Sequence, residues 1–159
     1  MANLKQEFGT STSITITLNS LAASATEGRE STAIDNTSDK FLDALVNVTV
    51  KFVAGTPSSA TAVFVYVYGS EDGTNYTDNA TGTDAAITFR NPTAMVLLGT
   101  IPIPTSGALT YKSHPMAVAK AFGGVMPRKW GIAVMVDTGV NLDSTGNSAK
   151  YTGIYATST

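Results

Sequence analysis

The stretch that decides the fold runs from residue 42 to residue 69 and reads LDALVNVTVKFVAGTPSSATAVFVYVYG. In its first half an apolar set alternates with a polar set: Ala44, Val46, Val48, Val50 and Phe52 against Asn47, Thr49 and Lys51. This period of two is typical of a β-strand that places one face on a core. Turn formers follow at 55–59, in a connection longer than a two-residue hairpin turn. The stretch therefore predicts a half-buried strand, a loop and a second strand.

The second predicted strand is apolar on both faces. One face carries valines and the other aromatic residues: Val63, Val65 and Val67, and Phe64, Tyr66 and Tyr68. Such a strand is expected to be covered on both sides, either by its own fold or by another molecule. We therefore take Phe64, Tyr66 and Tyr68 as candidate interface residues. We also expect the chain to associate with itself as a dimer or trimer, the usual closed assemblies.

The rest of the chain contains further short β-rich runs between turn formers. We expect strands at 13–18, 85–89, 94–101, 109–113, 128–136 and 149–156, a polar strand after a turn at Gly28, and one helical turn at 117–121. The run at 94–101 is almost continuously apolar, which predicts a buried strand. About eight strands and at most one short helix predict an all-β fold, an antiparallel β-sandwich of the jelly-roll type.

The two ends of the predicted domain differ in character. Residues 1–12 are mostly small and polar, and we expect them to be an arm that is disordered in the isolated chain and orders on a neighbour. Its apolar residues Leu4 and Phe8 are therefore also candidate interface residues. Residues 13–159 predict a single β-sandwich domain, because no shift in composition marks a boundary and the length suits one core.

Composition narrows the classes of partner. Charged residues make up 14% of the chain, against about 25% in an average domain, and the net charge is −2. The basic residues form no stripe that could neutralise phosphates, which argues against nucleic acid. No apolar run approaches the roughly 20 residues of a membrane span, and there is no cysteine for a disulfide or a thiolate site. A surface with so few charges favours burial against a partner.

No set of residues predicts a reaction centre. His114 is the only histidine and stands beside a proline, which argues against a catalytic triad or a histidine metal site. The loop at 70–83 and the residue after it carry Asp72, Asn75, Asp78 and Asp84, whose oxygens suit calcium, but the spacing lacks the glycine and the closing glutamate of an EF-hand. We predict a solvated loop of Asx turns, no enzyme activity, and no catalytic, metal or cofactor site.

Four long stretches carry a resemblance to a known family. They are SITITLNSLA at 13–22, ESTAIDNTSDKFLDALVNVTVK at 30–51, VYVYGSEDGTNYTDNATGTDAAIT at 65–88 and YKSHPMAVAKAFGGVMPRKWGIAVMVDTG at 111–139. Together they resemble a family of short virion structural proteins encoded near the head genes of tailed bacteriophages. The resemblance implies a capsid decoration, or cement, protein that is made in the host cytoplasm and binds the major capsid protein on the capsid surface. It implies no catalytic residue.

Two functions therefore stay open at the level of sequence. The first is a non-enzymatic virion structural protein that stabilises the assembled head, with a place in the tail or at a vertex as a variant. The second is a carbohydrate-binding module, in which Phe64, Tyr66, Tyr68 and Trp130 form an aromatic platform for sugar beside the loop at 70–84. Strand aromatics interleaved with valines usually pack in a core or an interface, which favours the first.

Overall fold

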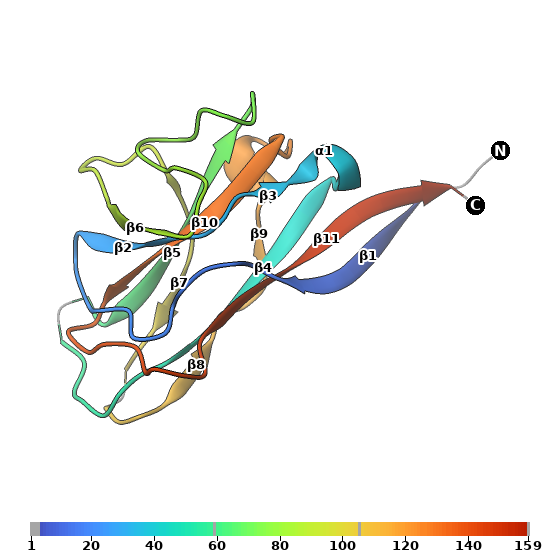
Figure 1. Ribbon diagram of the computed structural model, residues 1–159. Helices are drawn as coiled ribbons and strands as arrows, with labels where there is room; N and C mark the ends of the chain where they lie inside the picture. Colours follow the sequence, from blue (N-terminus) through green and yellow to red (C-terminus); the bar gives the residue numbers. More distant parts are fainter. Residues whose placement is uncertain (1–3, 59, 105, 159) are drawn as a thin grey trace.

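The computed structural model describes residues 4–58, 60–104 and 106–158 and consists of two antiparallel β-sheets packed face to face (Figure 1). We name each sheet after one of its inner strands, β4 and β5. The β4 sheet contains, in spatial order, β1 (Leu4–Ser13), β11 (Ser148–Ser158), β4 (Asp43–Lys51) and β8 (Thr110–Lys112), and β9 (Met116–Ala117) also pairs with β4. The all-β sandwich predicted from the sequence is confirmed.

The second sheet, the β5 sheet, has longer central strands and shorter outer ones. It contains, in spatial order, β6 (Ala85–Thr88), β2 (Glu27–Glu30), β10 (Lys129–Asp137), β5 (Ala62–Ser70) and β7 (Val96–Pro102), and β3 (Ile34–Asp35) also pairs with β10. The helical segments of the described ranges are one turn each: α1 (Asn36–Asp39) and the 3₁₀ turn η1 (Ala119–Phe122). The predicted helical turn therefore exists and ends at Gly123, whose φ of 71° suits a glycine.

The strand order is that of a jelly roll. Both β2 and β3 pair with β10 and count as one interrupted strand, both β8 and β9 pair with β4 and count as another, and β6 is an addition at the sheet edge. The β4 sheet then holds the first, eighth, third and sixth strands, and the β5 sheet the second, seventh, fourth and fifth. This is the eight-strand, double Greek-key arrangement.

The core lies between the two sheets and is built by the predicted alternation. The inward side chains of β4, β5 and β10 are almost completely buried: Ala44, Val46, Val48, Val50, Val63, Val65, Val67, Trp130, Ile132, Val134 and Val136. Burial of each valine stabilises the fold by about 1.5–3 kcal/mol. The rings of Trp130 and Tyr151 pack in a T-shaped arrangement, with centroids 5.5 Å apart. The three core strands expected from the sequence are therefore confirmed.

The first predicted strand is displaced along the chain. Residues 4–12, expected to be disordered, form most of β1, and residues 1–3 of that predicted arm lie outside the described residues. Residues 14–18 keep the expected alternation, with Ile14 and Leu18 buried, but they belong to no ladder. The Ile14 amide donates to Ala149 in β11, whereas the Thr15 carbonyl accepts from Thr32 beside β2. The segment crosses from one sheet to the other, so neither sheet can extend along it.

Two further expectations about strands were wrong. The apolar run at 94–101 contains the edge strand β7, in which Leu97 is 47% exposed and Ile101 is buried. Gly28 is not in a turn but inside β2, where an added Cβ would collide with the Val134 carbonyl of β10. A continuous apolar run does not distinguish an edge strand from a buried one, and a glycine marks close backbone approach as readily as a turn.

Candidate binding surface

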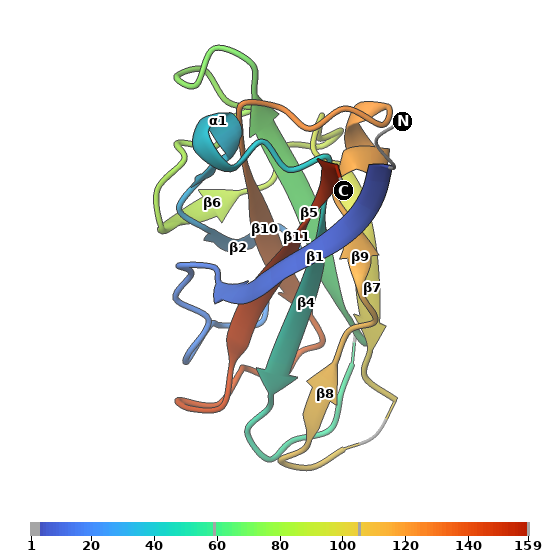
Figure 2. The ribbon, with the colours of Figure 1, turned by 90° about the vertical axis from the view of Figure 1, so that its right-hand side faces the viewer.

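The most exposed apolar part of the molecule is a two-stranded ribbon. The strand β11 pairs with β4 only as far as Ile154, opposite Asp43, but with β1 as far as Ser158, opposite Leu4. The ends of β1 and β11 therefore continue together past the edge of the sandwich (Figures 1 and 2). Every residue of β1 is exposed except Gly9, which is half-buried. We call residues 4–8 and 154–158 the ribbon.

The two faces of the ribbon differ. Leu4, Gln6 and Phe8 share one face with Ile154 and Ala156, and Leu4 and Phe8 are 79% and 61% exposed. A shallow depression of about 300 Å³ lies on the ribbon and at its base, where it reaches Leu42. Ile154 at the base of this face is buried, whereas Leu4 and Phe8 are open to apolar contact within the described structure.

The opposite face of the ribbon is polar. Lys5 and Glu7 share it with Tyr155 and Thr157. The Glu7 carboxylate accepts a hydrogen bond from the Thr157 hydroxyl at 3.0 Å and one from the Tyr155 hydroxyl at 3.4 Å. The ribbon is thus amphipathic, with its charges on the face opposite the exposed leucine and phenylalanine.

The base of the ribbon is anchored to the sandwich. The Phe41 ring packs on Tyr151 and Tyr155, with both centroid distances 6.3 Å, and lies close to Gly9 and Gly153. An added Cβ at Gly153 would overlap the Phe41 ring, so the glycine makes room for this anchor. The register of β1 on β11 shifts between Phe8 and Ser11. The ribbon therefore has a fixed base and an uncovered tip.

The aromatic face of β5, by contrast, is covered by the chain itself. Tyr68 is 0% exposed and packs with Ile87, Met95 and Ala133, and its hydroxyl donates to the Ser31 carbonyl. Burial raises the pKa of Tyr68 above the usual tyrosine value. Tyr66 is half-buried against the Phe89 ring, with centroids 5.0 Å apart.

These positions change the interpretation of the predicted interface residues. Tyr68 offers no surface to another chain, and Phe64, next to Met135 in the adjacent strand, is half-buried. The aromatic face of β5 therefore gives no reason to expect a second molecule on it. Trp130 is buried on the inner face of the sandwich, so the four aromatic residues do not form a common platform for sugar. Of the candidate interface residues, Leu4 and Phe8 are the ones that the fold leaves open.

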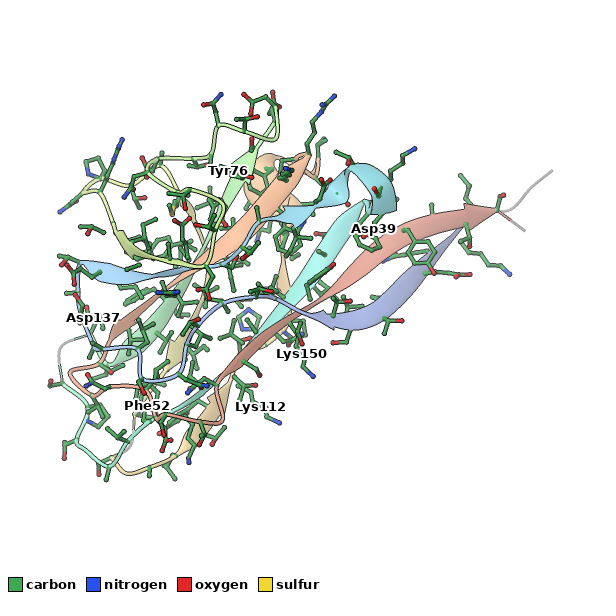
Figure 3. All side chains as sticks on the ribbon, in the orientation of Figure 1. Asp39, Phe52, Tyr76, Lys112, Asp137 and Lys150 are labelled. Atoms are coloured by element: carbon green, nitrogen blue, oxygen red, sulfur yellow. The ribbon has the colours of Figure 1, made fainter. Side chains whose placement is uncertain are left out.

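The cover over β5 comes from the loop at 71–84, which is held near its C-terminal end by a buried carboxylate. Glu30 is 1% exposed and accepts hydrogen bonds from the Thr81 amide, at 2.9 Å, and from the Thr81 hydroxyl, at 2.8 Å. Tyr76 of the loop packs edge-on against Tyr68, with centroids 5.7 Å apart. Figure 3 shows Tyr76 on the side of the molecule away from Lys112 and Lys150. The loop therefore forms a fixed cover over the outer face of β5.

Two aspartates of this loop accept hydrogen bonds from neighbouring groups of the fold. The Asp72 carboxylate accepts from the amides of Asn75 and Thr74, and these bonds hold its pKa well below the usual range. Asp78 accepts from the Thr93 hydroxyl and the Ala94 amide, and its pKa is also lowered. The contacts of Asp72 are those of the expected Asx turn, whereas Asp78 binds a segment 15 residues further along the chain.

Asp84, the last residue of the same loop, connects the loop to the sandwich. Its carboxylate forms an ion pair with Arg29 at 2.6 Å and accepts from the Thr17 amide and hydroxyl. Partial burial acts to raise the pKa of Asp84, but the hydrogen bonds from Arg29 and Thr17 outweigh it and the pKa is lowered. No three His, Cys, Asp or Glu side chains in the described ranges are grouped so that they could hold a metal ion.

Other exposed groups complete the surface. His114 is exposed, in the segment between β8 and β9. Lys112 and Lys150 extend from the outer face of the β4 sheet (Figure 3). No helix within the described ranges has the length and apolar character needed to cross a membrane. Comparisons of the chain with models of protein families, with curated proteins and with solved structures found no match.

Sequence reasoning overlooked several exposed apolar residues. Leu42 and Val125 are 58% and 73% exposed, and Val96 and Leu97 of the edge strand β7 are 42% and 47% exposed. Leu42 is in phase with the buried residues of the alternating strand, so the alternation itself predicts a buried side chain there and gives no signal of its exposure. Val125 follows the Gly123 and Gly124 pair, but an isolated apolar residue after a turn is common on surfaces.

Proposed function

We propose that this chain is a non-enzymatic structural protein of a tailed-bacteriophage virion that decorates the assembled head. It binds the major capsid protein on the outer surface of the capsid and stabilises the expanded shell. The four stretches that resemble phage head-gene products support this proposal, and so does the jelly roll, an architecture common in viral capsid proteins. The function is therefore one of assembly and needs no reaction centre.

The observation that carries the proposal is the ribbon. A two-stranded ribbon is marginally stable in water, because it lacks the third strand and the covered apolar face that stabilise larger sheets. Here the ribbon leaves Leu4 and Phe8 exposed, whereas the aromatic face of β5 is covered by the loop at 71–84. A chain that buries Tyr68 so completely yet leaves its ribbon open is best explained by a neighbouring subunit on the ribbon.

Binding through many copies compensates for the low affinity of each single contact. A patch of this size buries too little area for a tight complex by itself. When linked copies touch several shell subunits, the later contacts become intramolecular, and avidity rises by about 10²–10⁴. Binding to the expanded shell alone stabilises that shell by mass action.

The first test is to find the protein in purified particles and to measure its copy number by mass spectrometry. A number comparable with that of the capsid subunits is expected. A number in single digits would move the protein to the tail or to a vertex, and absence from the particle would contradict the proposal.

The second test adds purified protein back to undecorated heads. The double variant Leu4→Ser and Phe8→Ser should saturate heads poorly and leave them heat-sensitive. A matched control is Val96→Ser with Leu97→Ser, which removes exposed apolar side chains from the edge strand β7. Equal saturation and equal heat resistance with the ribbon variant would show that the ribbon is not the anchoring surface.

Carbohydrate binding remains the second candidate because of a different feature. A depression of about 630 Å³ lies between the start of the loop at 71–84 and residues 122–127, and it combines the aromatic rings of Tyr76 and Phe122 with the Glu71 carboxylate. Rings and carboxylates are the groups that bind sugars in shallow sites. Glycan-array binding that is lost in Glu71→Ala, with head decoration unaffected, would favour this function.

A further inference from the structure

The sequence of the ribbon strand is complementary to itself when it runs antiparallel. Residues 4–8 read LKQEF: apolar, basic, neutral, acidic, apolar. We propose that two copies of this chain join through the outer edges of their β1 strands, antiparallel, with a two-fold axis at Gln6. This inference rests on the proposed function only in treating the ribbon as an assembly device. It names the first partner of the ribbon as a second copy of the chain.

The free edge of β1 makes such pairing available. In the described part of the chain β1 is the last strand of the β4 sheet, and its outer backbone edge has no partner. Proteins commonly protect such edges with prolines, short strands or covering loops. Here the strand has ten residues, contains no proline and is exposed on both faces. Joining two edges would turn two marginal ribbons into one four-stranded sheet, which is the step that gives a small sheet independent stability.

The side chains fix the register. With the axis at Gln6, Lys5 lies opposite the partner's Glu7, and Leu4 lies opposite the partner's Phe8. Symmetry repeats each pair, so the dimer gains two pairs of opposite charge and two aromatic–aliphatic pairs. Cross-strand pairs of both kinds are favourable. Lys5 makes no ion pair within the described residues, so its charge is available to a neighbour.

The competing arrangements place like charges together. A shift of the axis to Lys5 or to Glu7 sets two lysines or two glutamates directly opposite each other. Parallel in-register stacking does the same at both positions, and like charges directly opposite are destabilising. The shift in register between Phe8 and Ser11 also ends the straight part of the edge. The charges therefore select a closed pair over an open stack of copies.

The pairing leaves the apolar face of the ribbon for the shell. Leu4 and Phe8 meet across the new pair on one face, together with the exposed Ala156 of each copy, and the charged pairs lie on the other. The interface involves only five residues per strand, which is smaller than a standard one. We therefore expect a dissociation constant of about 100 μM in solution, strengthened by avidity when both copies are bound to one head.

Charge exchange tests the register. Lys5→Glu alone and Glu7→Lys alone each replace two favourable pairs with two repulsive ones, and each should weaken self-association about tenfold at low salt, measured by sedimentation over a concentration series. An equimolar mixture of these two variants should associate again as a heterodimer, and the double variant should recover the homodimer. Lys150→Glu is the matched control, because it makes the same change in charge on the exposed outer face of the β4 sheet.

A cysteine placed on the axis tests the symmetry. The chain contains no cysteine, so Gln6→Cys introduces a single thiol that should face its own copy and form an intermolecular disulfide under mild oxidation. Ser11→Cys, on the same strand but away from the axis, should cross-link much less. Equal cross-linking of both variants, or an equal loss of association in Lys150→Glu and Lys5→Glu, would overturn the register.

The inference and the proposed function can fail separately. A wild-type chain that stays monomeric to about 1 mM, with no cross-link through Gln6→Cys, overturns the inference even if the protein decorates heads. A chain that forms the dimer but never binds heads leaves the inference standing and removes the proposed function.

Discussion

Two strand surfaces of this molecule carry apolar side chains outside the main core, and the chain covers one of them but leaves the other exposed. The outer face of β5 carries Tyr66 and Tyr68, and the loop at 71–84 with Phe89 and Met95 covers it so well that Tyr68 is 0% exposed. The ribbon carries Leu4 and Phe8, which are 79% and 61% exposed. An apolar strand face therefore indicates a partner only when no segment of the same chain lies over it.

The two regions also differ in what they are expected to contribute: the covered β5 face to the stability of the fold, and the ribbon to assembly. The loop over the β5 face is held in place by the hydrogen bonds of four carboxylates to neighbouring backbone or side chains. These carboxylates are Glu30, Asp72, Asp78 and Asp84. The tip of the ribbon is held by the ladder between β1 and β11 and by the Glu7 contacts. Substitutions in the first region should change the free energy of unfolding, whereas substitutions in the second should change association.

The largest expected effect is at Tyr68. Tyr68→Ala removes a completely buried ring and its hydrogen bond to Ser31, which should lower the free energy of unfolding by about 3–5 kcal/mol, measured by urea denaturation. Tyr155→Ala, which removes a partly exposed tyrosine ring at the base of the ribbon, should cost clearly less. Similar costs for both would mean that the loop does not cover β5 as tightly as its contacts indicate.

Glu30 provides the next test, because it holds the C-terminal part of the covering loop at Thr81. Glu30→Ala leaves the Thr81 amide without its acceptor and should cost about 2 kcal/mol, with faster hydrogen exchange at Thr81 and its neighbours. The control is Glu27→Ala, which removes an exposed carboxylate from the same strand. If exchange in the loop is unchanged by Glu30→Ala, the loop is fixed by its ring contacts alone.

How far the sequence could lead depends on the same distinction. The alternation at 44–52 and at 128–136 predicted core strands correctly, because the period of side chains along a strand is a local property. The two apolar faces of β5 predicted cover on both sides, which the structure confirms for Tyr68. Which segment supplied that cover could not be read from the sequence, because the loop at 71–84 has no apolar period and is held by scattered hydrogen bonds to Glu30 and Arg29.

The ribbon was missed for a related physical reason. Residues 4–12 lack a core face, so their pattern resembles that of a disordered arm, and their order comes from pairing with β11 near the other end of the chain. Such distant pairing leaves no local signal in residues 4–12, although β11 itself was predicted at 149–156. Leu4 and Phe8 were nevertheless recognisable as the apolar residues of a polar segment, and they are the exposed apolar side chains of the ribbon.

The dependence of stability on pH should report on the covering loop. The pKa values of Asp72, Asp78 and Asp84 are lowered in the folded chain relative to the ordinary value of 3.8. The unfolded chain therefore binds more protons below about pH 4, and stability that is fully present above this value is lost as the pH falls.

We expect the melting temperature to fall below about pH 4 and the slope to be smaller in Asp72→Asn. Glu71→Gln, at the neighbouring exposed position, is the matched control. A slope that is the same in Asp72→Asn and in the wild type would show that the Asx turn does not contribute to acid stability.

The smallest expected effect on stability, and the one that decides the comparison, is at the tip of the ribbon. Phe8→Ala removes a side chain that is 61% exposed, so the free energy of unfolding of the monomer should change by less than about 0.5 kcal/mol in urea at low protein concentration. At high concentration the same variant should associate more weakly, because the aromatic–aliphatic pair across the two-fold axis is lost. A cost above about 2 kcal/mol in the dilute monomer would mean that Phe8 belongs to the fold after all, since only burial within the chain produces so large a loss. In that case the ribbon would be a part of the sandwich like the face of β5, and the exposed position of Phe8 would no longer support a role in assembly.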